Sequence, residues 1–108
     1  MSLTYTFPAP TALSQVGMVP GYATIDAFNG DDRFTQNRRV SQARWICLGA
    51  DGAEAAVIDQ RLADDRRLQT VVATGFDACV AVRLDLVATT APGSRDNVAI
   101  STVRLAPA

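Results

Sequence analysis

The chain has 108 residues, ten basic and eleven acidic, and is 48% hydrophobic. This length fits one domain spanning 1–108, and the hydrophobic share excludes a disordered acidic segment. The net charge of −1 argues against a nucleic-acid binder, whose footprint is a basic excess. No apolar run approaches the roughly 20 residues of a membrane helix, and the first residues lack the basic and apolar regions of a signal peptide. We therefore expect a protein made in the cytoplasm that binds neither nucleic acid nor membrane.

Two residue types that carry much enzyme chemistry are missing. All ten basic residues are Arg, and the chain has neither Lys nor His. The absence of His removes the commonest general base and transition-metal ligand. The absence of Lys removes Schiff-base chemistry and the P-loop lysine. Carboxylates remain, and only Glu54 among them is a Glu. We therefore expect a protein that is not an enzyme and that has no cofactor.

The N-terminal half predicts a strand, two turns and a loop. Residues 3–7 alternate apolar and polar side chains, as a strand does. Pro8 and Pro10 lack a ladder donor and are expected to end that strand. Residues 1–10 could be the edge strand of a sheet or an arm laid on a neighbouring subunit. Residues 11–18 are ambiguous, 19–22 and 28–32 predict turns, and the polar run 33–42 predicts an exposed loop.

The C-terminal half predicts mostly strands. Residues 45–48 form a short apolar run, 68–74 read as a strand, 80–86 alternate cleanly, and 98–105 form a last strand. Residues 53–68 contain good helix formers, with Ile58 and Leu62 four positions apart. The same stretch also fits a strand around Val57, and this alternative stays open. Short strands at spacings near ten residues predict an all-β, antiparallel β-sandwich.

The two cysteines, Cys47 and Cys79, allow at most one disulfide. Both sit beside apolar residues, where a free cysteine behaves as a small hydrophobic side chain. We expect them to be reduced and buried, in keeping with synthesis in the cytosol.

Three short segments resemble a known family of sugar-binding sandwiches. They are the turn at 29–32, the Trp-Ile-Cys-Leu-Gly strand at 45–49, and the closing pair formed by 81–84 and 96–103. Over about residues 20–105 the chain resembles the discoidin-like, or coagulation factor 5/8 C-type, domains. The resemblance implies a galactose-binding jelly-roll fold and a carbohydrate-binding function. Thr102 stands where the family's closing motif has an acid that helps to hold calcium, so we expect no calcium.

Several side chains are candidates for binding. Asp31 and Asp32 are weak calcium candidates, since two carboxylates in a turn could supply hard oxygen ligands; the alternative is a capped turn in water. Trp45 could stack on a sugar ring, although its apolar neighbours favour the core. The remaining candidates are charged or aromatic residues suited to protein interfaces, each with an ordinary exposed or edge-strand alternative: Tyr5, Phe7, Arg38, Arg39, Arg66 and Arg67.

These observations favour a structural role over catalysis. The first hypothesis is an assembly module, a subunit of a larger homopolymeric particle such as a bacteriophage virion, where it would decorate the capsid or form part of the tail. Its partners would be further copies or other structural subunits. The alternative is a carbohydrate-binding module of the discoidin type, whose partner would be a glycan. Two exposed aromatic side chains along one groove would favour the glycan alternative.

Overall fold

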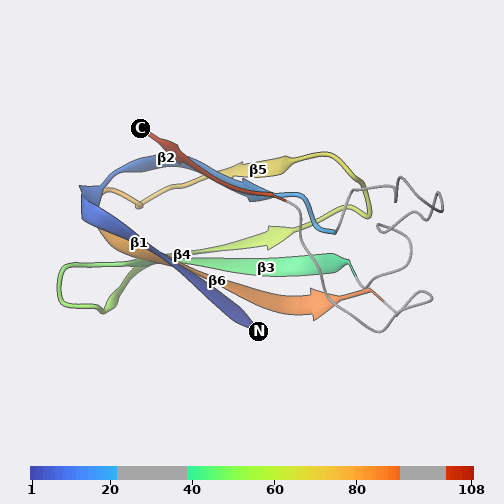
Figure 1. Ribbon diagram of the computed structural model, residues 1–108, viewed down its shortest axis with the longest axis horizontal. Helices are drawn as coiled ribbons and strands as arrows, with labels where there is room; N and C mark the ends of the chain where they lie inside the picture. Colours follow the sequence, from blue (N-terminus) through green and yellow to red (C-terminus); the bar gives the residue numbers. More distant parts are fainter. Residues whose placement is uncertain (22–38, 91–101) are drawn as a thin grey trace, which may run out of the picture.

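The computed structural model describes residues 1–21, 39–90 and 102–108, which form two antiparallel sheets packed face to face (Figure 1). The first sheet has the strand order β1-β6-β3-β4 and the second β5-β2-β7. The strands are β1 (Ser2–Thr11), β2 (Leu13–Met18), β3 (Val40–Leu48), β4 (Glu54–Arg61), β5 (Gln69–Val72), β6 (Cys79–Thr89) and β7 (Val103–Pro107). The prediction of an all-β, antiparallel sandwich is confirmed.

The core lies between the two sheets and takes side chains from both. Trp45 from β3 and Leu84 from β6 face Val16 and Met18 from β2, and all four are fully buried. The alternation along β6 that predicted a strand therefore marks one face directed at the core. Trp45 is a core residue, as its apolar neighbours indicated, and is not a platform for a sugar ring.

The helix left open over 53–68 does not form. Residues 54–61 are the strand β4, which pairs with β3 in a register that joins Trp45 to Ile58. Alternate side chains of β4 face the core, where Ile58 is half-buried and Gln60 is fully buried. Pairing with β3 outweighs the helix propensity of the alanines, which is worth only tenths of a kcal/mol per residue.

Two predicted boundaries are wrong. Strand β1 does not end at Pro8 but runs to Thr11, because it is an edge strand and its pairing with β6 is irregular between Thr6 and Thr11. Proline is tolerated where no ladder bond is required of it. The predicted loop 33–42 already belongs to β3 from Val40 onward. Of the predicted last strand 98–105, residues 98–101 lie outside the described residues.

The two cysteines are joined, so the prediction of free thiols is wrong. Cys47 near the end of β3 and Cys79 at the start of β6 form a disulfide, with Cα atoms 5.3 Å apart. Both side chains face the core and are fully buried. Adjacent antiparallel strands bring together residues that are 32 positions apart in the chain. The cysteines therefore no longer argue for a reducing compartment, since disulfides persist mainly in oxidising surroundings.

Candidate interaction surface

The outer face of the four-stranded sheet carries a row of charged side chains. The register places Ser2, Asp85, Arg44 and Asp59 side by side across β1, β6, β3 and β4. The Ser2 hydroxyl donates to Asp85 Oδ1 at 2.6 Å, and Arg44 Nε donates to Asp59 Oδ1 at 2.8 Å. Opposite charges on neighbouring strands stabilise their pairing, so the charges in this row have partners within their own sheet.

A second row beside the first is partly apolar. It runs from Thr4 through Arg83 and Ile46 to Val57. Ile46 is fully buried although it faces away from the sandwich core, whereas Val57 on β4 remains 48% exposed. Arg83 contacts Asp85 at 3.1 Å and Glu54 at 3.8 Å. The exposed apolar surface on this face therefore reaches the outer strand, β4.

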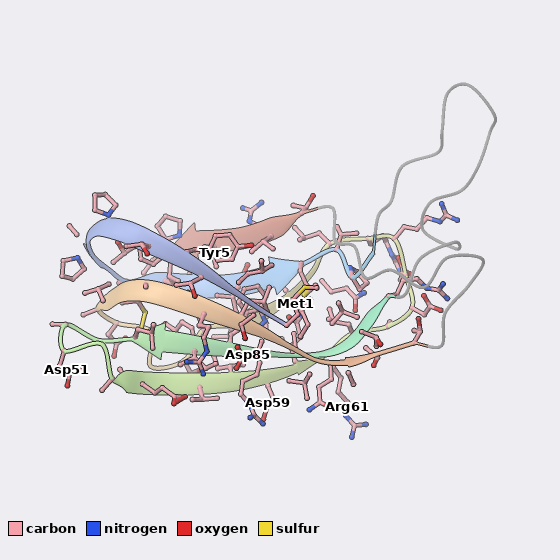
Figure 2. All side chains as sticks on the ribbon, turned by 60° about the horizontal axis from the view of Figure 1, so that its bottom comes forward. Met1, Tyr5, Asp51, Asp59, Arg61 and Asp85 are labelled. Carbon is pink, nitrogen blue, oxygen red and sulfur yellow. A yellow bond between two sulfur atoms is a disulfide. The ribbon has the colours of Figure 1, made fainter. Side chains whose placement is uncertain are left out.

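Among the described residues β4 pairs only with β3, and its other side, here called the open edge, carries backbone groups directed away from the sheet. The amide of Leu62 donates to the carbonyl of Ser41 at 3.0 Å, which continues the β3–β4 register by one residue. Backbone groups of successive residues in an antiparallel strand point alternately to its two sides. Starting at Leu62, the backbone groups of every second residue of β4 therefore point to β3. The backbone groups of the residues between them, Val57, Asp59 and Arg61, point to the open edge. Figure 2 shows β4 as the outer strand, with Asp59 and Arg61 along it.

The same edge is closed immediately beyond β4. The amide of Ala63 donates to Gln69 Oε1 at 2.8 Å, and Gln69 Nε2 donates to the Ala63 carbonyl at 2.9 Å. The Gln69 side chain thus pairs with Ala63 as a neighbouring strand would. This contact leaves the open stretch of edge confined to β4 itself.

The predicted interface residues do not gather into one site. Tyr5 and Phe7 pack half-buried against the core from β1, so residues 1–10 are an edge strand of their own sheet. Burial raises the pKa of the Tyr5 hydroxyl. Arg39 makes a bidentate pair with Asp64, with both contacts at 2.9 Å.

Arg67 pairs with Asp65 at 2.9 Å and is highly exposed. Arg66 also belongs to the segment between β4 and β5. Arg38 and the weak calcium candidates Asp31 and Asp32 lie outside the described residues. In the described parts of the chain, no three His, Cys, Asp or Glu side chains gather as a metal site would require.

Sequence reasoning missed the residues of β4 and its edge. Glu54, Val57, Asp59 and Arg61 lay in the segment whose secondary structure stayed open. A strand assignment would have exposed their alternation, because Ile58 and Gln60 face inward between them. Which edge of the sheet stays open depends on strand order, and no local pattern encodes that order.

Three aspartates make the free energy of unfolding depend on pH in the acid range. A hydrogen bond from Arg39 lowers the pKa of the Asp64 carboxyl, and hydrogen bonds from the side chain and amide of Arg67 lower the pKa of the Asp65 carboxyl. Hydrogen bonds from Ser2 and, to a smaller extent, from Arg83 lower the pKa of the Asp85 carboxyl. A lowered pKa in the folded state adds stability above the unfolded value, about 3.9 for Asp, and that stability is lost as the pH falls through the lower folded value.

We therefore expect the free energy of unfolding, measured by urea titration, to decline as the pH falls below about 4. Ser2→Ala and Asp85→Asn should each make that decline shallower, by less than about 1 kcal/mol, because the contact is near the surface. An acid limb that is identical in the two variants and the parent would show that the Ser2–Asp85 contact does not contribute.

Comparisons with known proteins identify the fold but no family. No protein-family model matches the chain, and no curated protein matches it. The chain is similar to a solved structure described as the NMR structure of the Streptococcus pyogenes NAD+-glycohydrolase translocation domain, with a TM-score of 0.69 and 15% identity. The match covers 98% of this chain and 86% of that one. At this identity the likeness shows the shared sandwich fold alone. Within the described residues, no helix has the length and apolar character needed to cross a membrane.

Proposed function

We propose that the chain is a non-enzymatic assembly module, which joins further copies of itself or other structural subunits in a larger particle. A bacteriophage virion, with the module on the capsid or in the tail, is the setting we favour. The observation that carries this proposal is the open edge of β4, with backbone groups of Val57, Asp59 and Arg61 directed outward. An extended strand from another chain can pair with such an edge.

One further observation supports assembly over the carbohydrate-binding alternative, and a second is compatible with it. The described aromatic side chains, Tyr5, Phe7, Trp45 and Phe76, are buried or half-buried, so none offers the exposed ring that a discoidin-type glycan module would stack on a sugar. The buried disulfide suits oxidising surroundings, of which virion surfaces are one example.

Electron microscopy of native particles tests the proposal. Antibodies against the chain, with gold labels, are applied to particles purified on a density gradient from the producing culture. We expect many labels per particle at regular positions, with the chain co-migrating with the particles in the gradient. A chain that stays with the free proteins, and binds a defined sugar on a glycan array, would replace this proposal with the carbohydrate-binding alternative.

A further inference from the structure

The described strand edges differ in how well they are protected against pairing. Strand β1 carries Pro8 and Pro10, β7 ends in Pro107, and β5 has only four residues. Prolines and short length are common protections of edge strands. Strand β4 has eight residues and no proline, so among the described edges it is the one best suited to accept another strand.

We propose that β4 pairs antiparallel with β4 of a second copy of this chain, about a two-fold axis perpendicular to the sheet. This inference rests on the proposed assembly function and names the partner of the same edge. It joins two four-stranded sheets into one continuous sheet across the dimer.

The charges of β4 favour a copy of itself as the partner, and favour the antiparallel direction. The strand begins with Glu54 and ends with Arg61, and both side chains are exposed. In the antiparallel pair each Arg61 lies opposite the partner's Ala55, one residue from its Glu54, and this contact occurs twice by symmetry. A parallel pair would place like charges together, which is destabilising when they are directly opposite.

The outward-facing backbone groups define the register. Because Val57, Asp59 and Arg61 direct their groups to the open edge, hydrogen-bonded pairs form when Val57 lies opposite the partner's Asp59. The axis then passes at Ile58, and the two half-buried Ile58 side chains meet on the inner face. The exposed Val57 gains a neighbour on the outer face, and Asp59 remains neutralised by Arg44.

The symmetry of the contact limits the pairing of β4 edges to two copies. An isologous two-fold interface uses the same patch on both subunits and closes on itself. The Gln69 side chain, bound to Ala63, blocks extension of the pairing beyond the end of β4.

Sedimentation of charge-reversal variants tests the pairing. We expect the parent chain to be a dimer, and Arg61→Glu and Glu54→Arg each to be monomeric, since like charges then meet twice. Mixed in equal amounts, the two variants should form a heterodimer, because each acid again meets a base. Arg104→Glu, an equal charge change on the exposed surface of β7, is the matched control and should remain dimeric.

A backbone variant tests the pairing independently, in case a charge variant misfolds. Val57→Pro removes an amide hydrogen directed at the open edge and leaves the bonds to β3 intact, so it should be folded by circular dichroism and monomeric. A parent that is monomeric at about 100 µM, a concentration that detects a Kd of that order, would overturn the inference. So would a folded Val57→Pro variant that stays dimeric, or a mixture that forms no heterodimer. Antibody labelling of particles is independent of these results, so the assembly proposal can stand or fall separately.

Discussion

Removing the disulfide is expected to lower the free energy of unfolding by about 3 to 4 kcal/mol, the loop-entropy value for a closed loop of this length. Cys47 and Cys79 are 32 positions apart, so the bond restricts a large part of the unfolded chain. The loop between them includes all of β4 and β5 and the hairpin that joins β4 to β3. The native bond therefore limits how far these strands can separate when the fold opens.

Two measurements separate the bond from the packing of its sulfur atoms. The parent chain is unfolded in urea with and without a strong reductant, which breaks the bond without changing the side chains. The Cys47→Ala, Cys79→Ala double variant is unfolded in parallel and should lose somewhat more stability, because both sites are fully buried and each replacement leaves a cavity.

Thiol counting provides the direct check. The denatured parent chain should show no free thiol before reduction and two afterwards. Two free thiols in unreduced protein from an oxidising preparation, together with a urea midpoint unaffected by reductant, would contradict the disulfide and restore the case for a reducing compartment.

The sequence contained enough information to predict the class of fold. The alternation along β6 predicts a strand because a period-two pattern arises when one face of a strand meets a core. The continuous apolar run 45–48 predicts a strand that is buried on both faces. Both segments supply fully buried residues. The apolar run that begins at Trp45 indicated its burial without any knowledge of strand order, although Ile46 next to it lies on the opposite face of the sheet.

What could not be predicted depends on contacts between distant segments. Strand β4 looks locally like a helix, and only its pairing with β3 decides the matter. Whether Cys47 and Cys79 form a disulfide depends on the pairing of β3 with β6, which no local sequence pattern shows. Pro8 and Pro10 suggested a strand end because proline interrupts a strand that is paired on both sides. Proline is tolerated in an edge strand, but the edge position of β1 follows from the strand order and cannot be read from the local sequence.

The candidate site was less predictable than the fold. Of the interface residues chosen from the sequence, Tyr5 and Phe7 serve the core and Arg39 pairs with Asp64. Residue type identifies side chains suited to an interface, but it does not show which of them the fold has already used. The open edge of β4 is a property of sheet order and of the direction of backbone groups.

The second large effect is expected at a buried hydrogen-bond network that links the two sheets. Trp45 Nε1 donates to Gln60 Oε1 at 2.9 Å, and Gln60 Nε2 donates to the carbonyl of Gln69 at 3.0 Å. Both side chains are fully buried. Since β3 and β4 belong to one sheet and Gln69 begins a strand of the other, the network fixes the position of one sheet over the other.

Trp45→Phe should lower the free energy of unfolding by about 2 to 4 kcal/mol, because it leaves a cavity and removes the donor to Gln60. Gln60→Leu should cost about 1 to 3 kcal/mol, since the Trp45 indole N–H and the Gln69 carbonyl then lose a buried partner. Circular dichroism is the appropriate probe in urea titrations, because Trp45 is the only tryptophan and its replacement removes the fluorescence signal.

The double variant distinguishes a hydrogen-bonded network from two independent core residues. Once Trp45 is replaced by Phe, Gln60 has already lost its donor, so replacing it with Leu removes a poorly paired polar group from the core. We therefore expect the double variant to lose less stability than the sum of the single variants, with a coupling energy of about 0.5 to 3 kcal/mol. Additivity within about 0.5 kcal/mol is typical of sites that do not interact, and finding it here would show that the indole and the amide contribute separately to the core.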